Sequence, residues 1–156
     1  MQKILDVHIG EVKIAKNGEI LQAILGSCVG IGIIWKDKSI CGLAHCLLPE
    51  SPVPTFEIGG RFVDQAIRSL MALMKIRQED LNSVALVIVG GGNMTKPGAN
   101  SLDLVGSCNF KTAINEANKR HLPILYSEGG GEVGRKLFID SARFTYKIEE
   151  IPRIAA

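Results

Sequence analysis

The spacing of apolar residues changes several times along the chain, and these changes predict a mixture of strands and helices. Residues 6–16, "DVHIGEVKIAK", alternate apolar and polar positions as a half-buried strand does, with a change of phase at Gly10. Other short apolar runs are bounded by glycine, proline or asparagine, which is typical of strands. Strands are therefore predicted for residues 20–25, 29–35, 40–47, 83–89, 123–128, 135–140 and 143–151.

Two segments follow a helical period instead. Between Arg61 and Arg77 the apolar residues recur at spacings of three and four, which places them on one face of a helix. A second helix is predicted from Phe110 to Arg120, ending before Pro123. No repeat, low-complexity run or linker divides the chain. The pattern predicts an α+β fold, a compact sandwich of largely antiparallel sheet with packed helices, as one domain covering residues 1–156.

Composition and charge narrow the classes of function. The 156 residues include 46% apolar and 22% charged residues, as in ordinary globular proteins. The net charge is only +2 and the basic residues are scattered, so a nucleic-acid partner is not expected. No apolar run is long enough for a membrane span, and the first ten residues do not resemble a signal peptide. We therefore expect a cytoplasmic protein that is not inserted in a membrane.

Residues 25–49, "LGSCVGIGIIWKDKSICGLAHCLLP", bring three of the four cysteines close to one of the three histidines. In a reducing compartment these cysteines are expected to be thiols. A zinc site using Cys41, His45 and Cys46 is an alternative, but the stretch lacks the paired CxxC spacing of most structural zinc sites. A third reading is a core strand that contains ordinary buried thiols.

The register of this hairpin decides whether Cys28 and His45 can interact. A two-residue loop at Lys36-Asp37 places them directly opposite each other, and a loop at Asp37-Lys38 makes them diagonal neighbours. Either even loop keeps both on one face of the sheet, because side chains alternate with a period of two. An odd loop would separate them.

The same face carries Gly30 and Gly32, which have no side chain to pack. They would either leave a shallow slot for substrate beside the thiol or accommodate a helix packed over the sheet. Gly26 and Ser27 indicate a bend at the entrance of the strand, with backbone N–H groups near the thiol. A thiol beside an imidazole is the arrangement that produces a nucleophilic thiolate.

At this point the sequence resembles the CheD family, the chemoreceptor glutamine deamidases of bacterial chemotaxis. The resemblance lies in the Gly-Ser-Cys of residues 26–28 and the segment Ala44-His45 to Pro49, with support from residues 7–20, "GGGNM" at 90–94 and "SEGGGEVGRKLFID" at 127–140. It implies a fold similar to that of bacterial toxin deamidases. It also implies hydrolysis of receptor glutamine side chains to glutamate with release of ammonia. The implied reaction requires no cofactor or metal.

Carried over by motif position, Cys28 is the nucleophile and His45 the general base. The bend and the glycine-bearing face described above make Gly26, Ser27, Gly30 and Gly32 the expected substrate-binding residues. Gln22 stands where the family has a third catalytic residue, a threonine that orients the histidine. The segment "VGSCNF", residues 105–110, also departs from the family's arginine-asparagine pair.

The resemblance implies receptors as partners, together with a CheC-type phosphatase. It leaves two alternatives to an active receptor deamidase. One is a weakly active or inactive module that binds such a phosphatase or the receptors. The other is a cysteine hydrolase with a different amide substrate.

Overall fold

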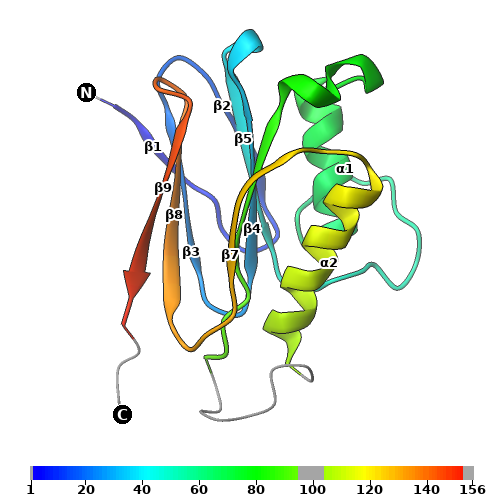
Figure 1. Cartoon of the computed structure of the whole chain (residues 1–156), viewed down its shortest axis with the longest axis vertical. Helices are drawn as coiled ribbons and strands as arrows, with labels where there is room; N and C mark the ends of the chain where they lie inside the picture. Colours follow the sequence, from blue (N-terminus) through cyan, green and yellow to red (C-terminus); the bar gives the residue numbers. More distant parts are fainter. Residues whose placement is uncertain (1, 95–103, 153–156) are drawn as a thin grey trace.

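The computed structural model describes residues 2–94 and 104–152 and arranges them in three layers (Figure 1). A four-stranded sheet forms one outer layer, a five-stranded sheet forms the middle layer, and two α-helices cover the far side of the middle sheet. The first sheet has the order β1 (Ile4–Asp6), β3 (Ile20–Leu25), β8 (Gly134–Asp140), β9 (Thr145–Ile151). The second has the order β2 (Val12–Ala15), β5 (Ile40–Cys46), β4 (Val29–Trp35), β6 (Ala85–Gly90), β7 (Ile124–Gly129).

The predicted fold class is confirmed. Within the described residues, only the β1–β3 and β6–β7 pairs are parallel, so the sandwich is largely antiparallel. The helices are α1 (Val63–Met74) and α2 (Val105–Lys119), and short 3-10 turns span Lys36–Lys38 and Gln78–Ser83. None of the described helices has the length and apolar content needed to cross a bilayer.

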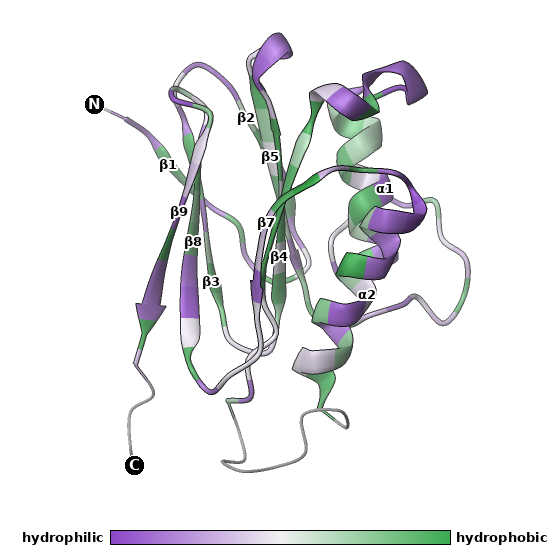
Figure 2. Ribbon diagram, viewed as in Figure 1, coloured by the Kyte–Doolittle hydropathy of each residue, from purple (hydrophilic) through white to green (hydrophobic). Residues whose placement is uncertain are grey.

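Strands β4 and β5 are buried along their whole length because they lie in the middle layer. Alternate residues of β4 face opposite sides: Ile31 and Ile33 pack towards the helices, whereas Ile34 packs towards the other sheet. Figure 2 shows the apolar residues concentrated on these central strands and the hydrophilic ones on the outer parts of the helices and turns. The middle sheet therefore separates two apolar cores, one on each side.

Helix α2 begins five residues before the predicted position. Its first turn contains Gly106, which reads as a poor helix former in the sequence. The structure explains this residue, because a β-carbon on Gly106 would lie only 2.7 Å from the carbonyl oxygen of Gly92. The start of α2 is therefore determined by close packing of its backbone against Gly91 and Gly92 and not by helix propensity.

Gly30 and Gly32 do not form the predicted slot. A β-carbon on Gly30 would lie 3.0 Å from Leu25 Cδ1, and one on Gly32 would lie 2.8 Å from Ile139 Cδ1. These neighbours belong to β3 and β8, so the two glycines let the four-stranded sheet approach β4 closely. They serve packing, as the alternative proposed, but against a sheet and not a helix. Gly30 and Gly32 lie in the interior, between the two sheets.

This packing predicts that Gly32→Val is destabilising. The added methyl groups must displace Ile139 in a filled interior, and overpacking of this kind costs about 1–3 kcal/mol. Urea denaturation of the wild type and the variant measures the loss, with Thr145→Val at an exposed position of β9 as the control. A Gly32→Val protein as stable as the wild type would instead indicate open space beside β4.

Candidate active site

Cys28 and His45 lie on the same face of the middle sheet, as an even register predicts. Gly30 pairs with His45 and Trp35 with Ile40, so Cys28, two residues before Gly30, is a diagonal neighbour of His45. This is the second of the two predicted registers, although residues 36–39 connect the strands through a 3-10 turn and not through a two-residue loop. Both side chains face the four-stranded sheet.

His45 is held by a backbone group. The imidazole is 4% exposed, and its Nδ1 lies 2.8 Å from the carbonyl oxygen of Val7. Because a carbonyl only accepts, Nδ1 carries the proton of the neutral ring and Nε2 keeps its lone pair. Nε2 is buried and has no hydrogen-bond partner among the described residues. This nitrogen is therefore available as a base, and burial lowers the pKa of His45 below its ordinary value of 6.5.

Cys28 has a mainly apolar environment. Its side chain is 6% exposed and belongs to the core between the sheets, together with Leu25, Val89 and Leu137. Burial raises the pKa of the thiol above its ordinary value of 9.0, and this is the only cause of the shift. Near pH 7 the resting site thus contains a neutral thiol and a neutral imidazole, which are not hydrogen-bonded to each other.

A cavity of about 400 Å³ opens beside His45. It is lined by Asp6, Val7, His8, Ile9, Gln22, Ile24 and His45. Ile9 and Ile24 are each more than half exposed, so the cavity offers an apolar wall to a molecule arriving from solvent. The cavity thus extends to the buried imidazole of His45.

Gln22 lines the cavity but its side chain does not hold the imidazole. Its Nε2 donates to Asp6 Oδ1 at 2.8 Å. Its main chain has a closer connection to the site, because the Gln22 carbonyl accepts from the N–H of Val7 at 2.7 Å and the Val7 carbonyl then contacts His45. The orienting role that the resemblance implies for this position belongs, in this structure, to the backbone of Val7.

The bend predicted at Gly26 and Ser27 is formed, and donors hold all three of its carbonyl groups. The N–H of Gly92 donates to the Gly26 carbonyl at 2.9 Å, and that of Gly91 donates to the Cys28 carbonyl at 2.9 Å. Between them, Asn109 Nδ2 donates to the Ser27 carbonyl at 3.1 Å. Gly26 and Ser27 are partly exposed.

Sequence reasoning missed Asn109. The residue is fully buried on α2, and its Nδ2 also donates to the carbonyl of Leu47 at 3.0 Å. One signal could have pointed to it: the buried face of α2 consists of Gly106, Ala113 and Ala117 apart from this one polar side chain. A lone amide on such a face needs partners.

The other cysteines do not join the site. Cys41 faces the other sheet, where burial raises its pKa to about 12, whereas Cys46 packs on the helix side. Cys41, His45 and Cys46 therefore do not converge as the zinc alternative requires. Within the described residues, no group of three or more His, Cys, Asp or Glu side chains could hold a metal ion.

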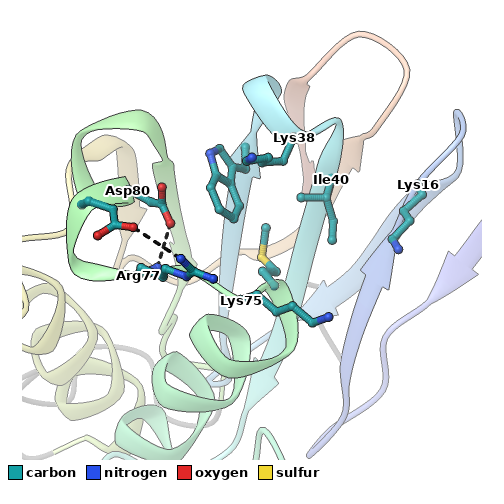
Figure 3. A pocket seen from close by; sticks show the side chains of 9 residues that line it. Lys16, Lys38, Ile40, Lys75, Arg77 and Asp80 are labelled. Carbon is teal, nitrogen blue, oxygen red and sulfur yellow. Dashed lines mark hydrogen bonds and ion pairs between the residues drawn. The ribbon is translucent and has the colours of Figure 1, made fainter.

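A second cavity, of about 480 Å³, lies at the opposite end of β4 and β5 (Figure 3). Its lining includes the apolar side chains of Trp35, Ile40 and Met74. Basic side chains from several segments also line it. These are Lys16, Lys38, Lys75 and Arg77. It shares no lining residue with the cavity at His45.

Comparison with known proteins identifies the family. The family described as "CheD chemotactic sensory transduction" matches residues 47–150. A protein of Ruegeria sp. (strain TM1040) named "Probable chemoreceptor glutamine deamidase CheD 2" is 41% identical over 167 residues, covering 96% of this chain and 93% of its own. A "Probable chemoreceptor glutamine deamidase CheD" of Bdellovibrio bacteriovorus is 36% identical and covers 96% of both chains.

Another relative, with the same name as that of Bdellovibrio, comes from Methanococcus maripaludis (strain C6); it is 31% identical and covers 86% of both chains. The family match begins at residue 47, but alignments that cover 96% of the chain also include the Cys28–His45 hairpin. This chain belongs to the CheD family.

Proposed function

We infer that this protein is a protein-glutamine deamidase that converts glutamine side chains of chemoreceptors to glutamate. Two relatives that cover 96% of the chain are named for this activity. The observation that carries the proposal is the site itself: a buried thiol and a buried imidazole on one face of the sheet, the imidazole nitrogen Nε2 lacking a partner. A thiol nucleophile and a nitrogen base are the groups that amide hydrolysis through a thioester needs.

We propose that the reaction begins when a receptor glutamine reaches the cavity at His45. His45 Nε2 accepts the proton of Cys28, and the sulfur attacks the carbon of the carboxamide. The developing oxyanion is stabilised by the backbone N–H groups of Ser27 and Cys28. Protonated His45 then gives its proton to the nitrogen, the C–N bond breaks and ammonia leaves. Water, activated by the same imidazole, hydrolyses the thioester to glutamate and the free thiol.

This scheme uses only the side chains of the protein, backbone N–H groups and water. We propose that Cys28 acts as nucleophile and His45 as general base, with Val7 orienting the ring through its carbonyl group. Gln22 contributes through its main chain, which fixes Val7. Because chemoreceptor glutamines are the proposed substrates, the proposal also places the protein in the cytoplasm, next to the receptors.

A second function has two observations in its favour. The resting thiol and imidazole are not hydrogen-bonded, and the Gln22 side chain is bound to Asp6, so the chain could bind partners while catalysing slowly. The partner in that case would be a CheC-type phosphatase or the receptors themselves. Purified protein that captures such a phosphatase but deamidates no receptor would favour this function.

The first prediction concerns the two catalytic side chains. Cys28→Ala should abolish deamidation of receptor glutamines because it removes the nucleophile. His45→Ala should lower the rate by about 10²–10⁴-fold through loss of the general base. Mass spectrometry of receptor peptides measures the conversion, with Cys46→Ala and Cys108→Ala as controls that keep activity. Full activity of Cys28→Ala would exclude this mechanism.

The second prediction concerns ionisation. Burial raises the pKa of Cys28 above 9.0 and lowers that of His45 below 6.5, so the free protein holds almost no thiolate near pH 7. The rate at which iodoacetamide alkylates Cys28 should therefore keep rising as the pH increases beyond 9.0, both in the wild type and in His45→Ala. Peptide mapping separates Cys28 from the exposed Cys108. A plateau between pH 6 and 8 that disappears in His45→Ala would instead indicate a preformed thiolate–imidazolium pair.

The third prediction separates the side chain of Gln22 from its main chain. Gln22→Ala removes the hydrogen bond to Asp6 but leaves the carbonyl that holds Val7, so His45 should stay oriented. We expect kcat to fall by less than about tenfold, since loss of one exposed hydrogen bond is worth about 0.5–1.5 kcal/mol. Receptor deamidation kinetics measure the change. A loss as large as that of His45→Ala would show that the side chain itself is catalytic.

A further inference from the structure

We propose that Asn109 is a positioning residue that builds the oxyanion hole: by holding the Ser27 carbonyl it aims the backbone N–H of Cys28 at the substrate oxygen. This inference rests on the proposed deamidase function and names a residue that the motif of Cys28 and His45 does not contain. Asn109 does not touch the reacting atoms, and it acts through the peptide that precedes the nucleophile.

The contacts of Asn109 determine its orientation. Its Nδ2 lies 3.1 Å from the Ser27 oxygen and 3.0 Å from the Leu47 oxygen, and both partners are carbonyls that can only accept. The amide nitrogen, not the amide oxygen, must therefore face the site. Ser27 adjoins the nucleophile, and Leu47 is two residues after the base. One buried side chain thus ties together the two segments that carry Cys28 and His45.

Peptide geometry transmits this contact to the site. The described chain contains no cis peptide bonds, and in a planar trans peptide the N–H points opposite to the C=O. The Cys28 N–H therefore points away from Asn109, and the Ser27 N–H points away from the Gly92 N–H that holds the Gly26 carbonyl. Neither of these two N–H groups donates to an acceptor within the described part of the chain. Two adjacent and oriented N–H donors are what an oxyanion requires.

Burying the amide of Asn109 costs free energy that an apolar side chain would not cost. Its side chain is fully buried, and Oδ1 has no hydrogen-bond partner among the described residues. A buried unsatisfied oxygen is unfavourable, so packing alone would favour an apolar residue at this position. The nitrogen supplies two donors in a place where α2 reaches the bend, because Gly106 lets the helix touch Gly91 and Gly92 directly.

Two measurements on the same variants separate this role from a merely structural one. Deamidation builds an oxyanion, whereas alkylation of Cys28 by iodoacetamide is a displacement at carbon that builds none. Asn109→Ala and Asn109→Ser should therefore lower kcat for receptor deamidation, by about 10²–10³-fold in the alanine variant, with KM changed by less than about threefold. The alkylation rate of Cys28 should stay within about twofold of the wild type. Asn115→Ala, at an exposed position of the same helix, is the matched control.

The possible results of these measurements distinguish failure of the Asn109 proposal from failure of the deamidase function. Protection of the buried Cys41 and Cys46 from alkylation reports that a variant is folded. Unchanged kcat in both folded Asn109 variants, or a fall in kcat matched by an equal fall in the alkylation rate, overturns the proposal while the deamidase function stands. Loss of the fold in both variants also overturns it, because Asn109 is then a folding residue. Wild-type protein without receptor deamidation shows that the proposed function itself fails, and this inference fails with it.

Discussion

The close approach of two backbone segments governs the geometry of the site. Residues 26–28 lie against residues 90–92, and a β-carbon on Gly90 would come within 2.3 Å of the Cys28 carbonyl oxygen. Gly90 also has a φ of +121°, a conformation that side-chain-bearing residues rarely adopt. Glycine in this segment lets Gly91 and Gly92 donate to the bend. The position of Cys28, the proposed nucleophile, is therefore set by a segment more than sixty residues away in the sequence.

The three-layer architecture explains the protonation states of Cys28 and His45. Because β4 and β5 have one sheet on one face and helices on the other, any side chain on them is withdrawn from water. The same burial raises the pKa of Cys28 and lowers that of His45, which favours the neutral form of each. The fold therefore sets the ionisation of the pair as well as its placement.

Much of the fold could be predicted from local patterns, since the alternation of apolar residues along the strands follows from burial on one face or both. The shared face of Cys28 and His45 followed from a period of two on the condition that the loop between the strands has an even length. What the sequence could not show is which layer covers that face: Gly30 and Gly32 look alike whether a helix, a sheet or a ligand approaches. Leu25 and Ile139 fill the space above them, and that contact depends on long-range packing.

The sequence also could not show which backbone groups contact the site residues. The group that orients His45 is the carbonyl of Val7, and a carbonyl is present at every position, so no residue type marks it. Gln22 was a candidate for the third catalytic residue because it stands where the family has a threonine, yet its main chain is what connects to the site through Val7. Asn109 acts across a separation of 82 residues from Ser27. A motif search along the hairpin could not include it.

The neutral resting pair has a consequence for how the site becomes reactive. The ordinary pKa values of a thiol and an imidazole, 9.0 and 6.5, already disfavour proton transfer by about 3.4 kcal/mol, and burial widens this gap. The transfer becomes favourable only when negative charge passes from sulfur to an oxygen that oriented N–H groups stabilise. In the proposed reaction a carboxamide at the bend provides that oxygen. Without such a substrate the buried thiol is almost entirely protonated near pH 7, so it is a weak nucleophile.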